Sequence, residues 1–167
     1  MSEAPKPAAI TIRPALSEDA DGITRVYLES AEHHARLDPE RCWIPPATAI
    51  SARYREARQH PPDAEQAITL VAELSGEMVG FVDARLERLP DPMLREFLYC
   101  HIEEIAVSSR HRNQGIGGRL LEAAENWGRR QGAEFASLYY LAANTRAGAL
   151  YQRMGYGVAA MKAIKRL

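Results

Sequence analysis

Three glycines within one short turn are the first feature of this sequence that could do chemistry. Residues 112–118 read RNQGIGG and lie between the run IEEIAV and the apolar-periodic segment LLEAAENW. Glycine near a helix start costs about 0.5–1 kcal/mol relative to alanine, so Gly115, Gly117 and Gly118 weaken the helix unless their bare backbone is used. The first N–H groups of a helix lack internal partners and lie at the positive end of its dipole. We therefore expect the amides of this turn, with Arg112 adding charge, to bind a pyrophosphate.

Two other phosphate-binding loops do not match this spacing. A GxGxxG loop would need glycine where Leu120 stands, and a Walker A loop needs a Gly-Lys-Ser/Thr sequence that is absent here. The glycines also fit a second explanation, in which they permit a helix to pack closely on a sheet. The turn alone does not decide between an anion site and close packing.

The histidines do not predict a metal site. His33 and His34 are adjacent, so on a helix their side chains point about 100° apart. Asp38 and His101 complete no known metal-ligand spacing with them. The chemistry of this chain is therefore expected to need no metal.

Hydrophobic periodicity predicts the elements that must position this turn. Apolar residues recur at helical spacing in four segments, and alternating or β-rich runs predict six strands. The pair Ser75 and Gly76 between two such runs predicts a hairpin turn. The order predicts an α+β domain with a mostly antiparallel sheet decorated by helices. The expected helices are 18–36, 48–59, 115–132 and 144–155, and the expected strands are 8–14, the two arms of 68–87, 97–107, 135–141 and 156–164.

Composition excludes several classes of protein. A length of 167 residues with 46% apolar side chains fits a single domain over 9–167, after a loose, proline-containing tail over 1–8. The net charge of -1, from 21 basic and 22 acidic residues, gives no positive field for a nucleic acid. No run approaches the ~18 apolar residues of a membrane helix, so no membrane contact is expected. Cys42 and Cys100 make no disulfide framework, which favours a cytoplasmic location.

Two ordered blocks carry a resemblance to a known family. The pattern Arg-x-x-Gly-x-Gly at Arg112, Gly115 and Gly117, behind IEEIAV, resembles the acyl-CoA loop of the GCN5-related N-acetyltransferase (GNAT) family. The later block AANTRAGALYQRMGY is similar to the family's following strand–helix–strand segment. The resemblance is specific over residues 67–156. It implies a GNAT-like α+β fold in three layers, with helices on both faces of a mixed, mostly antiparallel twisted sheet. It also implies a splay between the strands that end near Val107 and Leu141.

The resemblance also implies where acetyl-CoA, as co-substrate, would be held. The backbone of one strand end should pair with pantetheine as an added strand would, and Asn144 should bond to the coenzyme arm. The expected cofactor-binding residues are Ile105, Ala106, Val107, Arg112, Asn113, Gln114, Gly115, Ile116, Gly117, Gly118, Asn144 and Tyr151.

Acetyl transfer to an amine calls for a base, and two glutamates are candidates. With a pKa of ~10.4, only about one lysine-like amine in two to three thousand is neutral at pH 7. Glu103 and Glu104 lie on the strand that enters the loop, and strand alternation predicts that they point to opposite faces. Glu103 shares its parity with Ile105 and Val107, where the family often has a carboxylate, so Glu103 is the first candidate and Glu104 the second. Both glutamates also fit a solvated strand face or ion pairs.

Tyr151 is the candidate for the opposite proton transfer. Its place in the second block matches the tyrosine that the family uses as a general acid toward the departing thiolate, whose thiol has a pKa of ~8.5. On helical spacing alone, Tyr151 would be read as a core aromatic.

The resemblance implies an acetyl-CoA-dependent N-acetyltransferase acting by direct attack in a ternary complex. The acceptor would be a small-molecule or peptide amine, such as a polyamine, an amino acid or a protein amine, and the sequence does not choose among them. The alternative is a non-catalytic acyl-CoA-binding sensor or scaffold. A homodimer is compatible with the resemblance.

Overall fold

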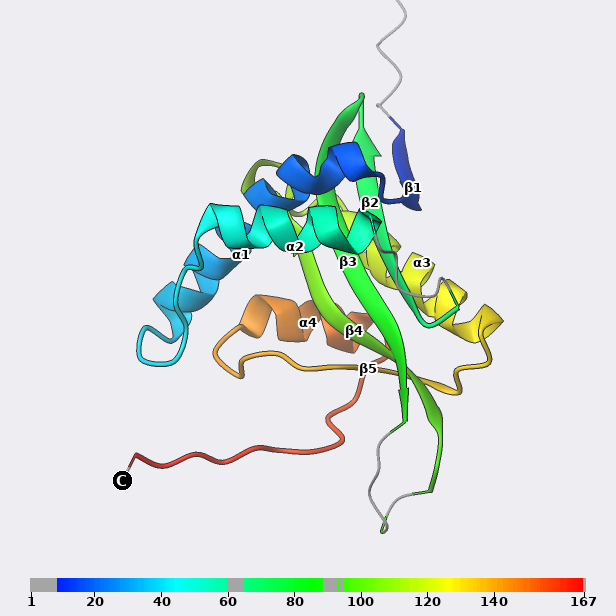
Figure 1. The fold of residues 1–167 in the computed structure, drawn as a ribbon. Helices are drawn as coiled ribbons and strands as arrows, with labels where there is room; N and C mark the ends of the chain where they lie inside the picture. The colour runs from blue at the N-terminus through cyan, green and yellow to red at the C-terminus, as the bar shows by residue number, and fades with distance from the viewer. Residues whose placement is uncertain (1–8, 60–64, 89–92, 94, 167) are drawn as a thin grey trace, which may run out of the picture.

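Figure 1 presents the protein as a computed structural model that describes residues 9–59, 65–88, 93 and 95–166. The expected loose tail over 1–8 lies outside these residues. Within the described part of the chain, none of the helices has the length and apolar character needed to cross a lipid bilayer.

Five strands form one sheet in which the order in space follows the order in the chain. The first four strands pair antiparallel, and the fifth pairs parallel to the fourth, which confirms the mixed, mostly antiparallel sheet. The hairpin turn between the second and third strands is also confirmed: Ser75 and Gly76 both have positive φ, as a two-residue primed turn requires. The strands are β1 (Ile10–Pro14), β2 (Ala67–Leu74), β3 (Glu77–Arg88), β4 (Leu98–Val107) and β5 (Phe135–Leu138).

Helices cover both faces of the sheet, as the sequence predicts (Figure 1). One face packs against the first two helices through a core that includes Ile23, Tyr54 and Phe81. The opposite face packs against the last two helices through a second core that includes Leu120 and Trp127. The α-helices are α1 (Ala20–Leu37), α2 (Ala47–Gln59), α3 (Ile116–Arg130) and α4 (Thr145–Arg153), and two short 3₁₀ turns, η1 (Ser17–Asp19) and η2 (Ser109–His111), precede α1 and α3.

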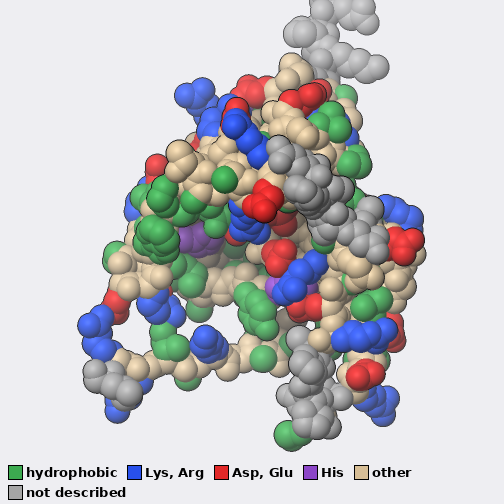
Figure 2. All heavy atoms as spheres, viewed as in Figure 1, with side chains coloured by type: hydrophobic (Ala, Val, Ile, Leu, Met, Phe, Trp, Pro, Cys, Tyr) green, Lys and Arg blue, Asp and Glu red, His purple; other side chains and the backbone are tan. Residues whose placement is uncertain are grey.

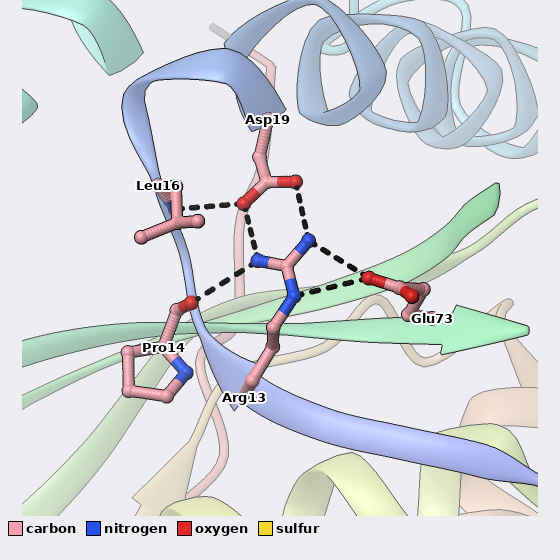
Figure 3. Close-up of polar contacts among 5 residues, drawn as sticks. All are labelled: Arg13, Pro14, Leu16, Asp19 and Glu73. Carbon is pink, nitrogen blue, oxygen red and sulfur yellow. Dashed lines mark hydrogen bonds and ion pairs between the residues drawn. The ribbon is translucent and has the colours of Figure 1, made fainter. Parts of the chain in front are cut away.

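A charged network holds β1 to the start of the first helical segment (Figure 3). The Arg13 guanidinium donates to both Asp19 oxygens at 2.7 and 3.0 Å and to Glu73 on β2 at 3.1 Å. Asp19, which is 6% exposed, also accepts from the amide of Leu16 at 2.7 Å. The hydrogen bond to Asp19 raises the pKa of Arg13. Because each acid compensates a cation that is partly withdrawn from water, the network joins β1 to β2 and to the turn before α1.

The helix α3 lies unusually close to β4. A Cβ atom built on Gly128 would lie 2.4 Å from the Cβ of Cys100, so only glycine fits this contact. Along the same helix face, Leu120, Leu121 and Ala124 are fully buried against the sheet. This packing fixes where the first turn of α3 begins relative to the end of β4.

Two strand predictions differ from the structure. β5 ends at Leu138, three residues before the expected Leu141. The expected strand over 156–164 is wrong, because this segment has neither helix nor strand. Its sequence alternates well enough, but a strand forms only when its backbone pairs with a neighbour, and this segment pairs with no strand among the described residues.

Candidate active site

The last two strands separate, and a cavity opens between them. Parallel pairing of β4 with β5 stops at Ile102 and Leu138, whereas β4 continues to Val107 with β3 alone beside it. The expected splay is therefore present. A cavity of about 440 Å³ occupies this region, lined by β4, the following loop, the start of α3, α4 and the C-terminal half of α1.

The glycine-rich turn places the start of α3 at this cavity. Gly115 is the N-cap residue with φ 76° and ψ 0°, and no side chain caps the first amides of the helix. Only glycine adopts this left-handed conformation without strain. A Cβ on Gly117 would lie 3.2 Å from Leu150 of α4, so close packing also explains this glycine. A Cβ built on Gly115 would have no other atom within 4 Å, and Gly115 lines the cavity. Close packing therefore does not explain this glycine.

Arginine side chains shape the same loop. Arg112 donates from Nε to the carbonyl of Val107 at 3.3 Å and lines the cavity. Arg146 on α4 donates to the side chain of Asn113 at 2.8 Å, and Asn113 itself has a positive φ of 63°. The end of β4 and the start of α4 therefore both contact this turn.

A carboxylate on α1 fixes the loop from the other side. Glu29 accepts hydrogen bonds from the amide of Ser109 at 2.6 Å and from the hydroxyl of Ser108 at 3.3 Å. Burial opposes the ionisation of Glu29, but the hydrogen bonds from the serines prevail and lower its pKa. An ionised Glu29 thus ties the middle of α1 to the residues that follow β4.

A β-bulge on β4 changes the direction of the two candidate glutamates. Asp83 on β3 is opposite Glu104 but the next β3 residue, Ala84, is opposite Ile102, so Glu103 is an extra residue without a partner. Ile102 belongs to the core under α3, whereas Glu104 lies opposite Asp83, which accepts a hydrogen bond from a tyrosine of α2. Ile102 and Glu104 therefore face opposite sides of the sheet. Glu103 pairs with the β3 arginine two residues after Asp83, on the same face as Asp83. The expectation that the two glutamates point to opposite faces is therefore wrong.

The two glutamates differ in their surroundings. Glu103 is 38% exposed and forms an ion pair with Arg85 on β3 at 2.9 Å. Glu104 is partly buried, and this burial raises its pKa from 4.5 to about 7, with the charge of Asp83 adding to the shift and Arg53 opposing it. A carboxyl that changes protonation near neutral pH is suited to accept a proton and release it again.

The charge beside Glu104 is itself deeply buried. Asp83 is 6% exposed and accepts hydrogen bonds from the hydroxyls of Tyr54 and Thr69, each at 2.6 Å. Burial raises the pKa of Asp83, and the two hydrogen bonds act in the opposite direction. This cluster gives Glu104 a low-dielectric, acidic neighbourhood.

Tyr151 lies on the opposite wall, on α4. It is 8% exposed and its ring makes edge contacts with Tyr140 and Tyr156, at centroid distances of 5.2 and 6.0 Å. Burial, with the charge of Glu104 next, raises the pKa of Tyr151 to about 12. Its hydroxyl therefore stays protonated at neutral pH and can donate a hydrogen bond into the cavity.

Comparisons with known proteins agree with this geometry. Residues 29–156 match the model of the acetyltransferase (GNAT) family. The chain belongs to the GNAT family. The N-acetyltransferase YhfO of Bacillus subtilis, described as uncharacterized, is 31% identical over 91 residues, a match that spans 54% of this GNAT chain and 59% of YhfO.

Solved structures share the GNAT fold of this chain. A mutant of the BH1408 protein from Bacillus halodurans has a TM-score of 0.84 at 21% identity, over 94% of this chain and 99% of that one. The aminoglycoside N-acetyltransferase AAC(6')-Iy in complex with CoA has a TM-score of 0.73 at 20% identity, over 99% of each chain. The α+β fold expected from the sequence is thereby confirmed.

The cavity of this GNAT protein gathers most residues that the sequence singles out. Of the expected site residues, all but the exposed Gln114 line it. The sequence missed its α1 wall, because the adjacent histidines carry no motif. It also missed Asp83, although an acid in the apolar run GFVDARL is a usable signal. The α1 residues that line the cavity are Ser30, His33 and His34.

Glu104 should make the stability of this GNAT protein depend on pH. The folded protein holds the Glu104 proton up to about pH 7, whereas the unfolded chain releases it near 4.5. The folded state binds more protons in this window, so the unfolding free energy should fall as pH rises through it, by roughly 2–3 kcal/mol. Urea unfolding of wild type and Glu104→Gln at pH 4.5–7 measures the difference. The matched variant Glu103→Gln should keep the wild-type slope, and an equal slope in Glu104→Gln would contradict the burial effect.

Proposed function

We propose that this protein transfers the acetyl group of acetyl-CoA to an amine, by direct attack in a ternary complex. The observation that carries the proposal is that one cavity combines unpaired backbone on β4, the uncapped start of α3, a partly buried Glu104 and the Tyr151 hydroxyl. Membership of the GNAT family supports acetyl transfer from acetyl-CoA in general. The CoA bound to AAC(6')-Iy, which has the same fold, is consistent with this reading.

Unsatisfied main-chain groups would bind the coenzyme. The amides of Ile116, Gly117 and Gly118 face no side-chain cap and lie at the positive end of the α3 dipole, which suits a diphosphate. On β4, the stretch 103–107 lacks a strand on the β5 side, so its N–H and C=O groups there can pair with an amide-containing arm such as pantetheine. Both groups of donors line the same cavity.

Glu104 would accept the proton of the acceptor amine. Its pKa of about 7 is closer to that of an amine than the ordinary value of 4.5. This makes the free energy of proton transfer from the amine more favourable by roughly 3 kcal/mol at most. Glu103 forms an ion pair with Arg85 at the surface. It would contribute to the electrostatic potential of the site and would not serve as its base. This reverses the order of preference that alternation predicts.

Tyr151 would donate to the thiolate that leaves. A phenol with a pKa of about 12 remains protonated through the neutral range, and the ring contacts of Tyr151 fix its direction. Its ionisation also responds to the charge of Glu104, so the proposed acid and base belong to one electrostatic unit. The amides of β4 would polarise the acetyl carbonyl.

The acceptor would be a small-molecule or peptide amine that enters beside α1. Glu103 and Glu104 line this side of the cavity, and an ionised carboxylate there suits a cationic amine. Burial lowers the pKa of His34, which therefore presents a neutral ring to the cavity near pH 7. The bisubstrate analogue bound to AAC(6')-Iy carries an amine-derived group, which supports a small amine in this fold.

Coenzyme binding should depend on the open side of Gly115. Gly115→Ala would place a Cβ at the proposed diphosphate and should weaken CoA binding at least about tenfold, because one charge-assisted hydrogen bond is worth about 1.5–3 kcal/mol. Gly132→Ala is the matched control: Gly132 follows the other end of α3, has φ 86° and meets no neighbour within 4 Å. Both variants should lose similar stability, but only Gly115→Ala should lose affinity in calorimetry. Equal CoA affinity in both variants contradicts the diphosphate site.

The base assignment predicts unequal effects of two similar substitutions. Glu104→Gln should lower kcat/KM for an amine acceptor about 10²–10⁴-fold and remove the rise in rate with pH near 7. Glu103→Gln removes an ion pair with Arg85 and should change the rate less than about tenfold. Thiol release from acetyl-CoA, measured against pH with a panel of amines and peptides, gives both profiles. A larger loss of kcat/KM in Glu103→Gln than in Glu104→Gln would identify Glu103 as the base.

Removal of the Tyr151 hydroxyl should slow turnover and leave coenzyme binding intact. Tyr151→Phe keeps the ring contacts with Tyr140 and Tyr156, so its kcat should fall about 10²–10⁴-fold without loss of CoA affinity. Tyr140→Phe, which alters the neighbouring ring on the same wall, should leave kcat nearly unchanged. Full turnover of Tyr151→Phe would reject the general-acid role. Coenzyme binding by wild type without turnover on any acceptor would favour the non-catalytic sensor or scaffold.

A further inference from the structure

An arginine on α2 lies close to the acids of the proposed site. The guanidinium carbon of Arg53 is 5.3 Å from the centroid of the Tyr54 ring. Apart from this ring contact, Arg53 forms no ion pair or hydrogen bond with the residues that the structure describes. Figure 2 shows acidic and basic side chains gathered near the centre of the view, over the sheet below α2. Arg53 therefore acts on the nearby acids through its electric field and not through a direct bond.

A chain of contacts leads from Arg53 to Glu104. Tyr54, the next residue after Arg53, donates a hydrogen bond from its hydroxyl to Asp83 at 2.6 Å. Asp83 in turn lies directly opposite Glu104 in the pairing of β3 with β4. Side chains that are directly opposite in an antiparallel pair stand on the same face of the sheet as neighbours. Arg53, Asp83 and Glu104 therefore belong to one charged cluster.

Only one member of this cluster can meet a ligand in the cavity. Glu104 lines the cavity, whereas neither Arg53 nor Asp83 is among the residues of its wall. A nearby anion disfavours the ionised form of a carboxyl group, and a nearby cation favours it. Asp83 and Arg53 therefore act on Glu104 in opposite directions, and they can influence proton transfer through it without contact with the acceptor.

Other ionisable groups near Glu104 are neutral or compensated. Glu103, its neighbour on β4, is compensated by the ion pair with Arg85 at 2.9 Å. Tyrosines from three helices also lie near Glu104, and burial raises the pKa of each, so they are uncharged at neutral pH. These tyrosines are Tyr27 of α1, Tyr54 of α2 and Tyr151 of α4.

The remaining charged groups belong to the cavity wall. His33 and His34 line it from α1, and burial lowers the pKa of His34. The arginines of the wall, which are Arg112, Arg146 and Arg153, lie in the loop before α3 and on α4. Of the residues that the structure describes, Asp83 and Arg53 are thus the two charges of opposite sign that act on Glu104 from outside the cavity.

We propose that Arg53 and Asp83 are positioning residues that set the protonation of Glu104 in opposite directions, Arg53 favouring its ionised form and Asp83 its protonated form. The inference rests on the proposed role of Glu104 as the base and adds the two residues that adjust this base. Arg53 stabilises the carboxylate that must accept the proton of the amine, and Asp83 stabilises the protonated carboxyl that results. The balance between them keeps both forms of Glu104 accessible near neutral pH.

Direct titration of the Glu104 carboxyl tests this balance in the full chain. Glutamate carboxyl groups carrying a carbon isotope label are followed by NMR against pH, and Glu104→Gln identifies the Glu104 signal. The wild-type midpoint should lie at about 7. Asp83→Asn removes a like charge and should move the midpoint about one pH unit lower. Arg53→Gln should move it about half a pH unit higher, a smaller change because Arg53 is exposed to solvent and partly screened.

Two control variants separate the charge of Arg53 from its structural contacts. Arg53→Lys keeps a positive charge at the same position and should keep the wild-type midpoint. Arg55→Gln removes another arginine of α2, one that pairs with Asp21 at 2.8 Å, and should also keep it. Opposite displacements in Asp83→Asn and Arg53→Gln support the proposal. Equal midpoints in wild type and Arg53→Gln, or the same displacement in Arg53→Lys, overturn it even if Asp83→Asn does not fold.

The rise of kcat/KM with pH separates this inference from the proposed function. If Glu104 is the base, the midpoint of that rise follows the carboxyl midpoint, to lower pH in Asp83→Asn and to higher pH in Arg53→Gln. A rate profile that stays in place while the carboxyl midpoint moves contradicts the role of Glu104 as the base, and the balance set by Arg53 and Asp83 stands. A carboxyl midpoint that stays in place overturns the balance, whatever the rate does.

Discussion

The separation of β4 from β5 beyond Ile102 and Leu138 is the constraint on which the rest of the site depends. Buried backbone N–H and C=O groups are almost always paired in proteins. Here the outer end of β4 loses its neighbour while α3 begins without a side-chain cap, so two sets of backbone groups are left facing one cavity. A sheet that remained paired to Val107 would satisfy the β4 groups internally and would have no room for a ligand between its strands.

The extra residue on β4 explains the electrostatics of the cavity. Without the bulge at Glu103, Ile102 and Glu104 would share a face, and the carboxyl of Glu104 would point into the core under α3. The bulge turns Glu104 instead toward Asp83, whose own charge is stabilised by hydroxyl donors from Tyr54 and Thr69 and by the charge of Arg53. Two acids so close in a poorly solvated place favour protonation of one of them. A local irregularity of the backbone thereby sets the protonation state of a side chain.

The features that local sequence controls could be predicted, and those that depend on pairing could not. The helix α3 has a strong apolar periodicity, and the turn at Ser75 and Gly76 has the residue types that positive φ requires, so both were accessible from sequence. A bulge leaves the sequence pattern unchanged, because an extra residue is visible only against its partner strand. The failed strand over 156–164 has the same cause: alternation indicates that a segment can pair, but not that a partner is within reach.

The tie between Glu29 and Ser109 joins the two halves of the cavity. Glu29 is on α1, the helix that also carries His33 and His34, whereas Ser109 begins the turn that leads to the glycine loop. A displacement of α1 by a molecule seated against its histidines must move the loop or break a short, charge-assisted hydrogen bond. Where such a displacement accompanies binding, reciprocity requires each half to change the affinity of the other by the same free energy. This contact between α1 and the loop runs through a single carboxylate that does not itself line the cavity.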